Sequence, residues 1–506
     1  MTRRQPRMTG PVRTPFAIRL DELARAEPRH PAVVAPGASI GYGELAERVR
    51  TCARHLARHG IRAPVPTGLS VDDDLANLVA CLAMLWTGIP QVPMPASEPL
   101  PQRLDVARRL AMTHVVADDD GQALDGVALV RVDRNDEGPD RADDPPPAAG
   151  DETADDPYAI YVTSSGTTGR PKLFGYGQRA LARRAEAIVL AQGYAPDERV
   201  MVAMPVSTYT GKFARLVALW HGATAVLSAG GSAPISSLFD LCERQRVTTL
   251  QLTVLQARNL MTAAGDGRRL PAFTRVFLGA ARMPPEFPRR FEEIVGAPVY
   301  DRYGTTEASL VATTWPQGDR GIDDAVGVPA PGMEVAIVDA SGAPVPRGTV
   351  GEIRIRSDMM ATSYVDDAQA TRRHFRDAWF CPGDMGSMTE DGVLRYLGRK
   401  DDMMVLNGIN IFPSEIERVL EEHPAIAAAA AFPIPSPLYG DIPAVAVELH
   451  PAAEADERSL AAYARQRLGA RAPRRVIVVD ELPRNAAGKV LKHELAAGLA
   501  GKRGDS

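Results

Sequence analysis

The densest group of hydroxyl side chains and glycines in this sequence lies between residues 161 and 172, after an apolar run from Tyr158. Glycines permit positive φ angles and let peptide N–H groups converge, while hydroxyls add donors and a lysine adds a cation. Such a loop can hold phosphate, although its lysine is not spaced as in a Walker A loop. A flexible linker is the alternative interpretation. The candidate residues are Thr163, Ser164, Ser165, Gly166, Thr167, Thr168, Gly169 and Lys172.

A second polar stretch, residues 301–307, directly follows an apolar run that predicts a strand. Ligands bind at the carboxyl ends of strands in open α/β sheets. At such a position Tyr303 could stack on a base, and the hydroxyls of Thr305 and Thr306 could donate to phosphate. The carboxylate of Glu307 could hold Mg²⁺ against phosphate oxygens. A polar turn at a strand end is the alternative interpretation.

Two single charged residues complete the set of candidates. Asp384 follows the turn glycine Gly383, and a carboxylate can accept hydrogen bonds from two hydroxyls at once. Lys489 ends the run Leu482-Pro-Arg-Asn-Ala-Ala-Gly-Lys. A cation there could bridge a carboxylate and an anionic phosphate chain, which lowers the barrier to their approach. Taken alone, however, these residues are typical of a turn and of a solvated tail.

Together, these stretches resemble the signature motifs of the adenylate-forming superfamily, which includes acyl-CoA synthetases, firefly luciferases and the adenylation domains of peptide synthetases. Five motifs follow in the family's order over nearly the whole chain. The resemblance implies a two-step reaction in which a carboxylate attacks the α-phosphate of ATP to give acyl-AMP, and the acyl group then passes to a nucleophile. It implies ATP, Mg²⁺ and CoA as ligands.

The resemblance also assigns roles to individual residues. The loop 163–172 would bind the phosphates of ATP. Lys489, Glu307 and Thr306 would be catalytic, with Glu307 as the metal ligand, and Asp401 would be the hinge between domains. The rest of the ATP or AMP site would consist of Gly279, Ala280, Ala281, Asp301, Tyr303, Gly304, Thr305, Asp384 and Arg399.

The acid pocket of the family is built partly by the segment that corresponds to residues 205–211, so Ser207, Thr208 and Tyr209 would line it. The aspartate with which relatives bind an α-amino group is absent, which disfavours amino acids. Ser207 and Thr208 also replace the aromatic-His pair of many acyl-CoA synthetases. An aryl, alicyclic or other natural-product acid and a fatty acid therefore remain open.

The acyl acceptor is inferred from residues 407–417, which resemble the loop that lines the pantetheine tunnel of acyl-CoA synthetases. Gly408 would allow a thiol arm to approach closely, whereas Val405 stands where many relatives have lysine. We therefore expect an acid–thiol ligase that makes acyl-CoA through acyl-AMP. One alternative delivers the acyl group to a carrier protein in trans or to an amine, or performs mainly one half-reaction, such as thioesterification of a supplied acyl-AMP. Another is a binding or regulatory protein that has lost adenylation.

Composition limits the remaining classes. The chain has 506 residues, of which 45% are hydrophobic, and a net charge of −5, so it can form several cores but offers no basic stripe for nucleic acid. Its four cysteines are widely spaced, which argues against a disulfide framework or a structural zinc site. No stretch is long and apolar enough to predict a membrane span or an export signal, so a cytoplasmic location is expected.

The order of apolar runs predicts an α/β fold in which a large N-terminal domain of doubly wound sheets carries a barrel-like β subdomain. A small, mobile α+β domain would follow, so that the two domains span residues 1–398 and 399–506. Within them, the apolar spacing predicts a helix over 42–59, and the acidic, proline-rich stretch 118–156 predicts a surface loop. Ser414 and Glu417 match a capping box at the start of another helix.

Overall fold

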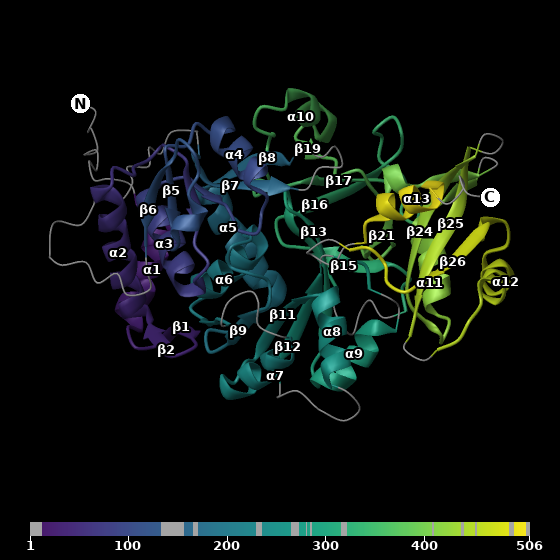
Figure 1. The fold of residues 1–506 in the computed structure, drawn as a ribbon, viewed down its shortest axis with the longest axis horizontal. Helices are drawn as coiled ribbons and strands as arrows, with labels where there is room; N and C mark the ends of the chain where they lie inside the picture. Colours follow the sequence, from purple (N-terminus) through teal and green to yellow (C-terminus); the bar gives the residue numbers. More distant parts are fainter. Residues whose placement is uncertain are drawn as a thin grey trace, which may run out of the picture. The chain divides into compact units, whose positions relative to one another are not determined.

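The computed structural model describes residues 13–132, 156–164, 171–228, 235–264, 273–279, 281–283, 286–314, 321–406, 409–436, 440–450, 453–484 and 490–501. These residues form two compact units. The first contains the described residues of Met1–Gln251, Thr306–Ser309 and Asp358–Arg372, and the second contains those of Leu252–Thr305, Leu310–Ser357 and Arg373–Ser506. Both units mix helices and strands, as expected (Figure 1). The domain boundary between residues 398 and 399 stays a prediction.

One sheet of the first unit positions the hydroxyl-rich loop. Its strand order is β6-β5-β3-β4-β7-β8, and all neighbouring strands are parallel except β7 and β8. In the antiparallel β7–β8 pair, Ser164 lies opposite Lys172, so the two ends of the loop are adjacent. The strands are β3 (Thr67–Ser70), β4 (Gln91–Pro93), β5 (His114–Ala117), β6 (Ala128–Arg131), β7 (Tyr158–Ser164) and β8 (Lys172–Gly177).

The other strands of the first unit follow the order β11-β9-β10-β1-β2, and β1 and β2 form a hairpin that the sequence did not predict. The strands are β1 (Pro31–Ala35), β2 (Ala38–Gly41), β9 (Arg199–Val202), β10 (Thr224–Val226) and β11 (Thr249–Thr253). The helices are α1 (Pro15–Ala26), α2 (Tyr42–Arg58), α3 (Asp74–Thr87), α4 (Leu100–Arg109), α5 (Gln178–Gln192), α6 (Tyr209–His221) and α7 (Ile235–Arg244).

Helix α2 shows why regularly spaced apolar residues allow a helix to be predicted from the sequence. Leu45, Val49, Cys52 and Leu56 recur every three or four residues, and all four side chains are buried. This spacing puts them on one face of a helix, whereas the polar residues between them face outward. The helix predicted over 42–59 is therefore confirmed to within one residue.

The second unit changes to short antiparallel strands, in agreement with the β subdomain that the sequence predicts. After the parallel pair β12–β13, the pairs β16–β17, β17–β20 and β20–β21 are all antiparallel. Its strands are β12 (Arg275–Gly279), β13 (Val299–Thr305), β14 (Ser309–Thr313), β15 (Ala325–Pro329), β16 (Glu334–Val338), β17 (Gly351–Arg356), β18 (Phe375–Arg376), β19 (Trp379–Phe380), β20 (Asp384–Met388) and β21 (Leu394–Arg399). Helices α8 (Val254–Ala264) and α9 (Phe287–Val295) belong to this unit, whereas most of α10 (Ala368–His374) belongs to the first unit.

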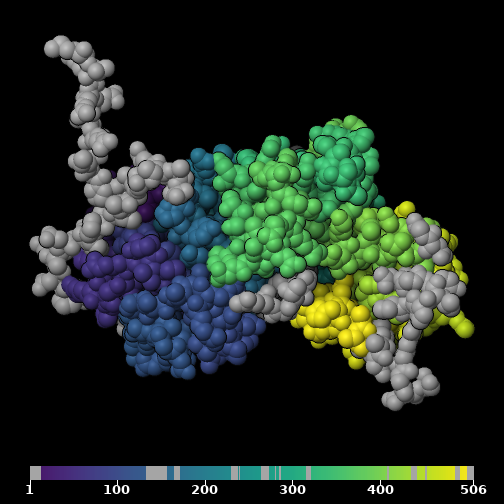
Figure 2. Space-filling view, turned by 90° about the horizontal axis from the view of Figure 1, so that it is seen from above, coloured from purple at the N-terminus to yellow at the C-terminus, as the bar shows by residue number. Residues whose placement is uncertain are grey.

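The C-terminal residues have an apolar core of their own, built around Met404, Ile416, Leu420, Val445 and Leu460. Helix α13, yellow in Figure 2, lies at the surface, because its residues His493 and Glu494 are exposed. The elements are β22 (Met404–Leu406), β23 (Ile409–Ile411), α11 (Pro413–Glu421), β24 (Ile426–Ser436), β25 (Gly440–Leu449), α12 (Glu457–Leu468), β26 (Arg475–Val479) and α13 (Lys492–Gly501).

The predicted capping box is wrong, although the helix itself forms as α11. The hydroxyl of Ser414 donates to the carbonyl of Leu397 at 2.7 Å, and Phe412 occupies the N-cap position without a side-chain cap. Glu417 accepts from the amide of Ala431 at 3.0 Å instead of reaching back to the helix start. Burial of both side chains in tertiary contacts thus outweighs the local capping pattern.

The loop predicted over 118–156 is wrong at its start. Residues 120–122 form a short 3₁₀ helix, and Ala128–Arg131 forms β6, which runs parallel to β5. The backbone of β6 pairs with β5, whose outer amides would otherwise stay unpaired, so four residues suffice for a strand. Residues 133–155 lie outside the described part of the chain.

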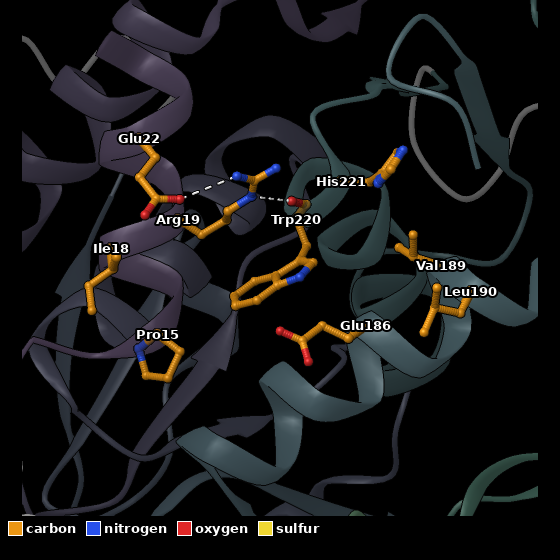
Figure 3. Close-up of a pocket in the computed structure, with 9 residues that line it drawn as sticks. All are labelled: Pro15, Ile18, Arg19, Glu22, Glu186, Val189, Leu190, Trp220 and His221. Carbon is orange, nitrogen blue, oxygen red and sulfur yellow. Dashed lines mark hydrogen bonds and ion pairs between the residues drawn. The ribbon is translucent and has the colours of Figure 1, made fainter. Parts of the chain in front are cut away.

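Three further features concern the cysteines, the possibility of a membrane span and the surface groove. All four cysteines are buried, and none of them forms a disulfide. In the described part of the chain, no helix combines the length and the apolar character needed to cross a bilayer. A surface groove of about 630 Å³ opens between α1, α5 and α6 of the first unit, with Trp220 in its wall (Figure 3). None of the residues expected to bind nucleotide or acid lines it.

A pair of glycine substitutions tests the packing of β14 against β15. Gly327 has a φ of +96°, and a Cβ there would lie 1.8 Å from the carbonyl oxygen of Thr313. Gly348 has a φ of +78° but no atom within 4 Å of such a Cβ. We expect Gly327→Ala to lower the free energy of unfolding by about 1 to 3 kcal/mol more than Gly348→Ala, because only the former overpacks the interior. Denaturant titration of both variants measures this, and equal losses would contradict the contact.

Candidate active site

A buried carboxylate lies at the base of the hydroxyl-rich loop in the first unit. Glu307 is 8% exposed and accepts hydrogen bonds from the Ser164 hydroxyl at 3.2 Å and the Tyr364 hydroxyl at 3.0 Å. Two hydroxyl donors offset part of the cost of burying this group. The contact with Ser164, the last residue of β7, brings two of the sequence-predicted site residues together.

Lys172 adds a cation to the same region. Its ammonium nitrogen lies 5.0 Å from the ring centroid of Tyr364, the tyrosine that also donates to Glu307. The neighbouring Thr163 is half-buried and lies opposite Leu173 in the β7–β8 pair. The expected phosphate-binding residues between them, Ser165, Gly166, Thr167, Thr168 and Gly169, lie outside the described residues.

The main chain at Thr306 and Glu307 is fixed from two sides. The carbonyl of Thr306 accepts from the Tyr176 hydroxyl and, at 3.4 Å, from the guanidinium of Arg184. The carbonyl of Glu307 accepts from the amide of Ala361 at 2.9 Å. Burial raises the pKa of Tyr176, so its phenol remains a neutral donor. The direction of the Glu307 side chain is therefore set by contacts that are distant in sequence.

The segment expected to form the acid pocket leads into α6. The side chain of Thr208 accepts from the Gly211 amide at 3.2 Å and donates to the Pro205 carbonyl at 2.7 Å, so its hydroxyl caps this helix. Gly211 is required here, because a Cβ would lie 2.1 Å from the Pro205 oxygen. Ser207 is half-buried beside them. That these residues line an acid pocket stays a prediction.

Tyr209 is surrounded by aromatic and cationic groups. Its ring stacks on Phe213 with centroids 5.6 Å apart and on Tyr176 with centroids 5.8 Å apart. Its hydroxyl accepts a hydrogen bond from Arg184 at 2.7 Å. One turn further along α6, burial lowers the pKa of Lys212 to about 8. Tyr209 is thus packed against two aromatic rings, with the Arg184 cation at its hydroxyl and Lys212 one turn further along α6.

In the second unit, a carboxylate is held between a tyrosine and an arginine. Asp384, at the start of β20, is 4% exposed. It accepts from the Tyr303 hydroxyl at 2.6 Å and from the Arg399 guanidinium at 3.1 Å. Burial opposes the charge of Arg399, but the Asp384 carboxylate, Tyr396 and Asp402 together raise the arginine's pKa. Three residues predicted from separate motifs are brought together here.

The remaining predicted residues of the second unit are mostly held through their main chains. Gly279 lies opposite Arg302 in the β12–β13 pair, where a Cβ would approach the Arg302 oxygen to 3.3 Å. The carbonyl of Asp301 accepts from the Thr313 hydroxyl at 3.0 Å. Gly304 and Thr305 end β13, Ala281 lies shortly after β12, and Ala280 lies outside the described residues.

The residues predicted as hinge, tunnel glycine and catalytic lysine are Asp401, Gly408 and Lys489. Asp401 lies in a 3₁₀ turn, Lys400–Asp402, and forms an exposed ion pair with Arg373 at 3.3 Å. Gly408 and Lys489 lie outside the described residues. Arg484 and Val490 are paired in a β-bridge.

Sequence reasoning missed four side chains of these clusters, namely Tyr176, Arg184, Tyr364 and Tyr396. One signal was present. Lys172, Phe174 and Tyr176 alternate along β8 and therefore share a face. Phe174 contacts both Tyr176 and Tyr364 edge-to-face. Tyr396, whose ring centroid lies 5.4 Å from that of Tyr303, and Arg184 carry no motif that could have revealed them.

Comparison with known proteins identifies the family. Residues 20–365 match the AMP-binding enzyme family, and residues 415–489 match the AMP-binding enzyme C-terminal domain. The chain belongs to the AMP-binding enzyme family. The expected membership of the adenylate-forming superfamily is thereby confirmed.

Named relatives of this AMP-binding enzyme are ligases. The 2-succinylbenzoate–CoA ligase of Geobacillus kaustophilus is 31% identical over 349 residues, or 68% of this chain and 70% of that protein. The indoleacetate–CoA ligase of Aromatoleum aromaticum is 29% identical over 507 residues, covering 96% and 98%. An amide bond synthetase from Marinactinospora thermotolerans has a similar structure, with a TM-score of 0.87 at 26% identity and coverage of 96% and 99%. The family and these names support the expected class, an AMP-forming acid–CoA ligase.

The carboxylates of this AMP-binding enzyme are compatible with Mg²⁺. Among the described residues, no three His, Cys, Asp or Glu side chains gather into a metal cage. Mg²⁺ prefers one or two carboxylates together with phosphate oxygens and waters. The single buried carboxylate of Glu307, beside the end of β7, fits that requirement.

The pKa of Asp301 provides a test of the site's burial. Burial raises it to about 7, above its ordinary value of 3.8. Between these values the folded protein binds a proton that the unfolded chain has lost, so this carboxyl stabilises the fold at low pH and the contribution disappears as pH rises through 7. We expect Asp301→Asn to remove a pH-dependent term on the order of a few kcal/mol.

Thermal melts from pH 5 to pH 8 check this expectation. The melting temperature of Asp301→Asn relative to wild type should rise across this range. A constant difference between the two proteins would contradict the raised pKa. Asp339→Asn serves as the control, because Asp339 is exposed and its pKa is lowered by the Ser341 hydroxyl.

Proposed function

We propose that this AMP-binding enzyme uses ATP to activate a carboxylic acid other than an α-amino acid and passes the acyl group to the thiol of CoA. The observation that carries the proposal is the Glu307 carboxylate, held by Ser164 and Tyr364 where β7 enters the hydroxyl-rich loop. A buried carboxylate beside a phosphate-binding loop suits the binding of a metal–nucleotide complex. Membership in the family supports ATP as that nucleotide.

In the first step, a carboxylate oxygen of the acid attacks the α-phosphorus of ATP, and the bond from that phosphorus to the pyrophosphate oxygen breaks. Both reactants are anionic, so cations must offset their repulsion. Lys172 would do so from β8 and Lys489 from the C-terminal motif. Glu307 would hold Mg²⁺, which when bound neutralises charge on the phosphate oxygens.

Asp384, Tyr303 and Arg399 would bind the nucleoside. Asp384 would accept the ribose hydroxyls, because a carboxylate offers about four acceptor sites. The contacts from Tyr303 and Arg399 orient this carboxylate. Tyr303 and Tyr396 together present an aromatic surface on which adenine would stack.

In the second step, the sulfur of CoA attacks the acyl carbonyl, and the bond to the phosphate oxygen breaks to release AMP. Gly408 would line the path of the thiol arm, and rotation at Asp401 would exchange the two half-reactions.

We propose an aryl acid as the substrate. The stacked rings of Tyr176, Tyr209 and Phe213 support this class, as do relatives that are named for 2-succinylbenzoate and indoleacetate.

An amine is the second candidate acceptor. The amide bond synthetase matches 96% of this chain with a TM-score of 0.87, which supports the alternative that the acyl group forms an amide. Val405 is 46% exposed at the position where many acyl-CoA synthetases carry lysine, so the thioester step could differ here. Delivery to a carrier-protein thiol would use the same first step.

Pyrophosphate release with a panel of aryl, alicyclic and fatty acids tests the adenylation step. We expect acid-dependent release that falls about 100- to 1000-fold in Lys489→Ala and in Glu307→Gln, because each removes a charge that stabilises the transition state. Glu334→Gln is the control, since it neutralises an exposed carboxylate paired with Arg356. Unchanged release in either site variant would contradict its assigned role.

Mass spectrometry of the products identifies the acceptor. Each active acid is incubated with ATP and with CoA, a holo-carrier protein or an amine. An acyl-CoA adduct is expected. An amide without any thioester would instead establish the second candidate, and accumulation of acyl-AMP alone would show that the enzyme performs only the first step.

A further inference from the structure

A buried arginine lies where two predicted site segments and strand β8 meet in the first unit. Arg184, on α5, is 1% exposed, although α5 carries none of the sequence-predicted site residues. Its guanidinium lies 3.7 Å from the ring centroid of Tyr176 on β8. Burying a guanidinium is costly unless its hydrogen bonds and charge are compensated. Its contacts therefore need a structural or functional explanation.

The two terminal nitrogens of the Arg184 guanidinium donate hydrogen bonds to two different segments. One terminal nitrogen donates to the Tyr209 hydroxyl at 2.7 Å, at the start of α6. The other donates to the Thr306 carbonyl at 3.4 Å, one residue before Glu307. Tyr176 donates to the same carbonyl and lies under the guanidinium. The planar guanidinium of Arg184 thus connects Tyr209, in the segment expected to bind the acid, to Thr306. Thr306 is the residue before Glu307, the proposed metal ligand.

We propose that Arg184 is a positioning residue that holds Tyr209 of the acid pocket and the Thr306–Glu307 peptide in a fixed relation. This inference rests on the proposed function, because it assigns acid binding to the segment of Tyr209 and Mg²⁺ binding to Glu307. Arg184 acts through these two contacts and does not itself touch acid or phosphate. Its loss changes both acid binding and the metal dependence of the first step.

Arginine is required for this role, because its planar fork presents two donors in a fixed geometry. Lysine would keep the charge over Tyr176 but supply a single nitrogen that cannot reach both acceptors at once. Methionine would keep most of the volume and lose both hydrogen bonds. Burial also raises the pKa of Tyr209, so its hydroxyl stays neutral and accepts from Arg184 throughout the physiological pH range.

The experiment compares Arg184→Met and Arg184→Lys with Arg103→Met. Arg103 is an equally suitable buried arginine, 4% exposed, that donates to the Ser70 hydroxyl and the Gln122 carbonyl away from the site residues of the first unit. Acid-dependent pyrophosphate release gives KM for the acid and the Mg²⁺ concentration at half-maximal rate. Calorimetric titration with ATP at several Mg²⁺ concentrations gives a second measure that needs no turnover.

We expect Arg184→Met to lower kcat/KM by about 10- to 100-fold, the effect of losing two charge-assisted hydrogen bonds. KM for the acid and the half-saturating Mg²⁺ concentration should both rise, and ATP titration should show the same shift in Mg²⁺ dependence. Arg184→Lys should fall between Arg184→Met and wild type. Arg103→Met should lower the melting temperature without moving either concentration dependence.

A double-mutant cycle with Tyr209→Phe isolates the contact on the acid side. If Arg184 acts on the acid through this hydroxyl, Arg184→Met should raise KM for the acid much less in the Tyr209→Phe background. Equal effects in both backgrounds, with unchanged Mg²⁺ dependence, would reduce Arg184 to a packing residue and overturn the proposal. A wild-type protein that releases no pyrophosphate with any acid would contradict the proposed function, and unshifted ATP titrations would then contradict the positioning role separately.

Discussion

The burial of the Glu307 carboxylate is the constraint on which the account of this site depends. A carboxylate that is 8% exposed requires donors, and the first unit supplies the hydroxyls of Ser164 and Tyr364. Satisfying this one group fixes the end of β7, where the hydroxyl-rich loop begins. The antiparallel β7–β8 pair then places Lys172 at the other end of that loop. The hydrogen bonds to Glu307 and the pairing of β7 with β8 therefore both determine where Ser164 and Lys172 lie at the two ends of the loop.

The second unit applies the same physical solution to another carboxylate. Asp384 is buried to a similar degree and is held by a tyrosine hydroxyl from β13 and a guanidinium from β21. In both units a tyrosine supplies one donor while its ring packs against further aromatic side chains. Each site thus combines a fixed charge with an apolar surface, which suits ligands that carry both phosphate or ribose and a flat ring.

The sequence predicted the residues whose chemistry is local to a motif but not the partners that orient them. Hydroxyls near glycines and a carboxylate after a strand carried the family resemblance, and that resemblance predicted that Ser164 and Glu307 belong to one site. Tyr364 and Arg184 could not be predicted, because nothing in their neighbours' types indicates which distant group they meet. The capping box predicted from Ser414 and Glu417 was wrong for the opposite reason. Both side chains form hydrogen bonds to distant residues in place of the local capping contacts.

Crystals grown with Mn²⁺ and a non-hydrolysable ATP analogue would test the central claim most directly, because manganese can be located by its anomalous scattering. The account predicts a manganese peak about 2.2 Å from a carboxylate oxygen of Glu307, with phosphate oxygens among its other ligands. It would be contradicted by a manganese peak bound to the analogue while Glu307 bonds only to Ser164 and Tyr364.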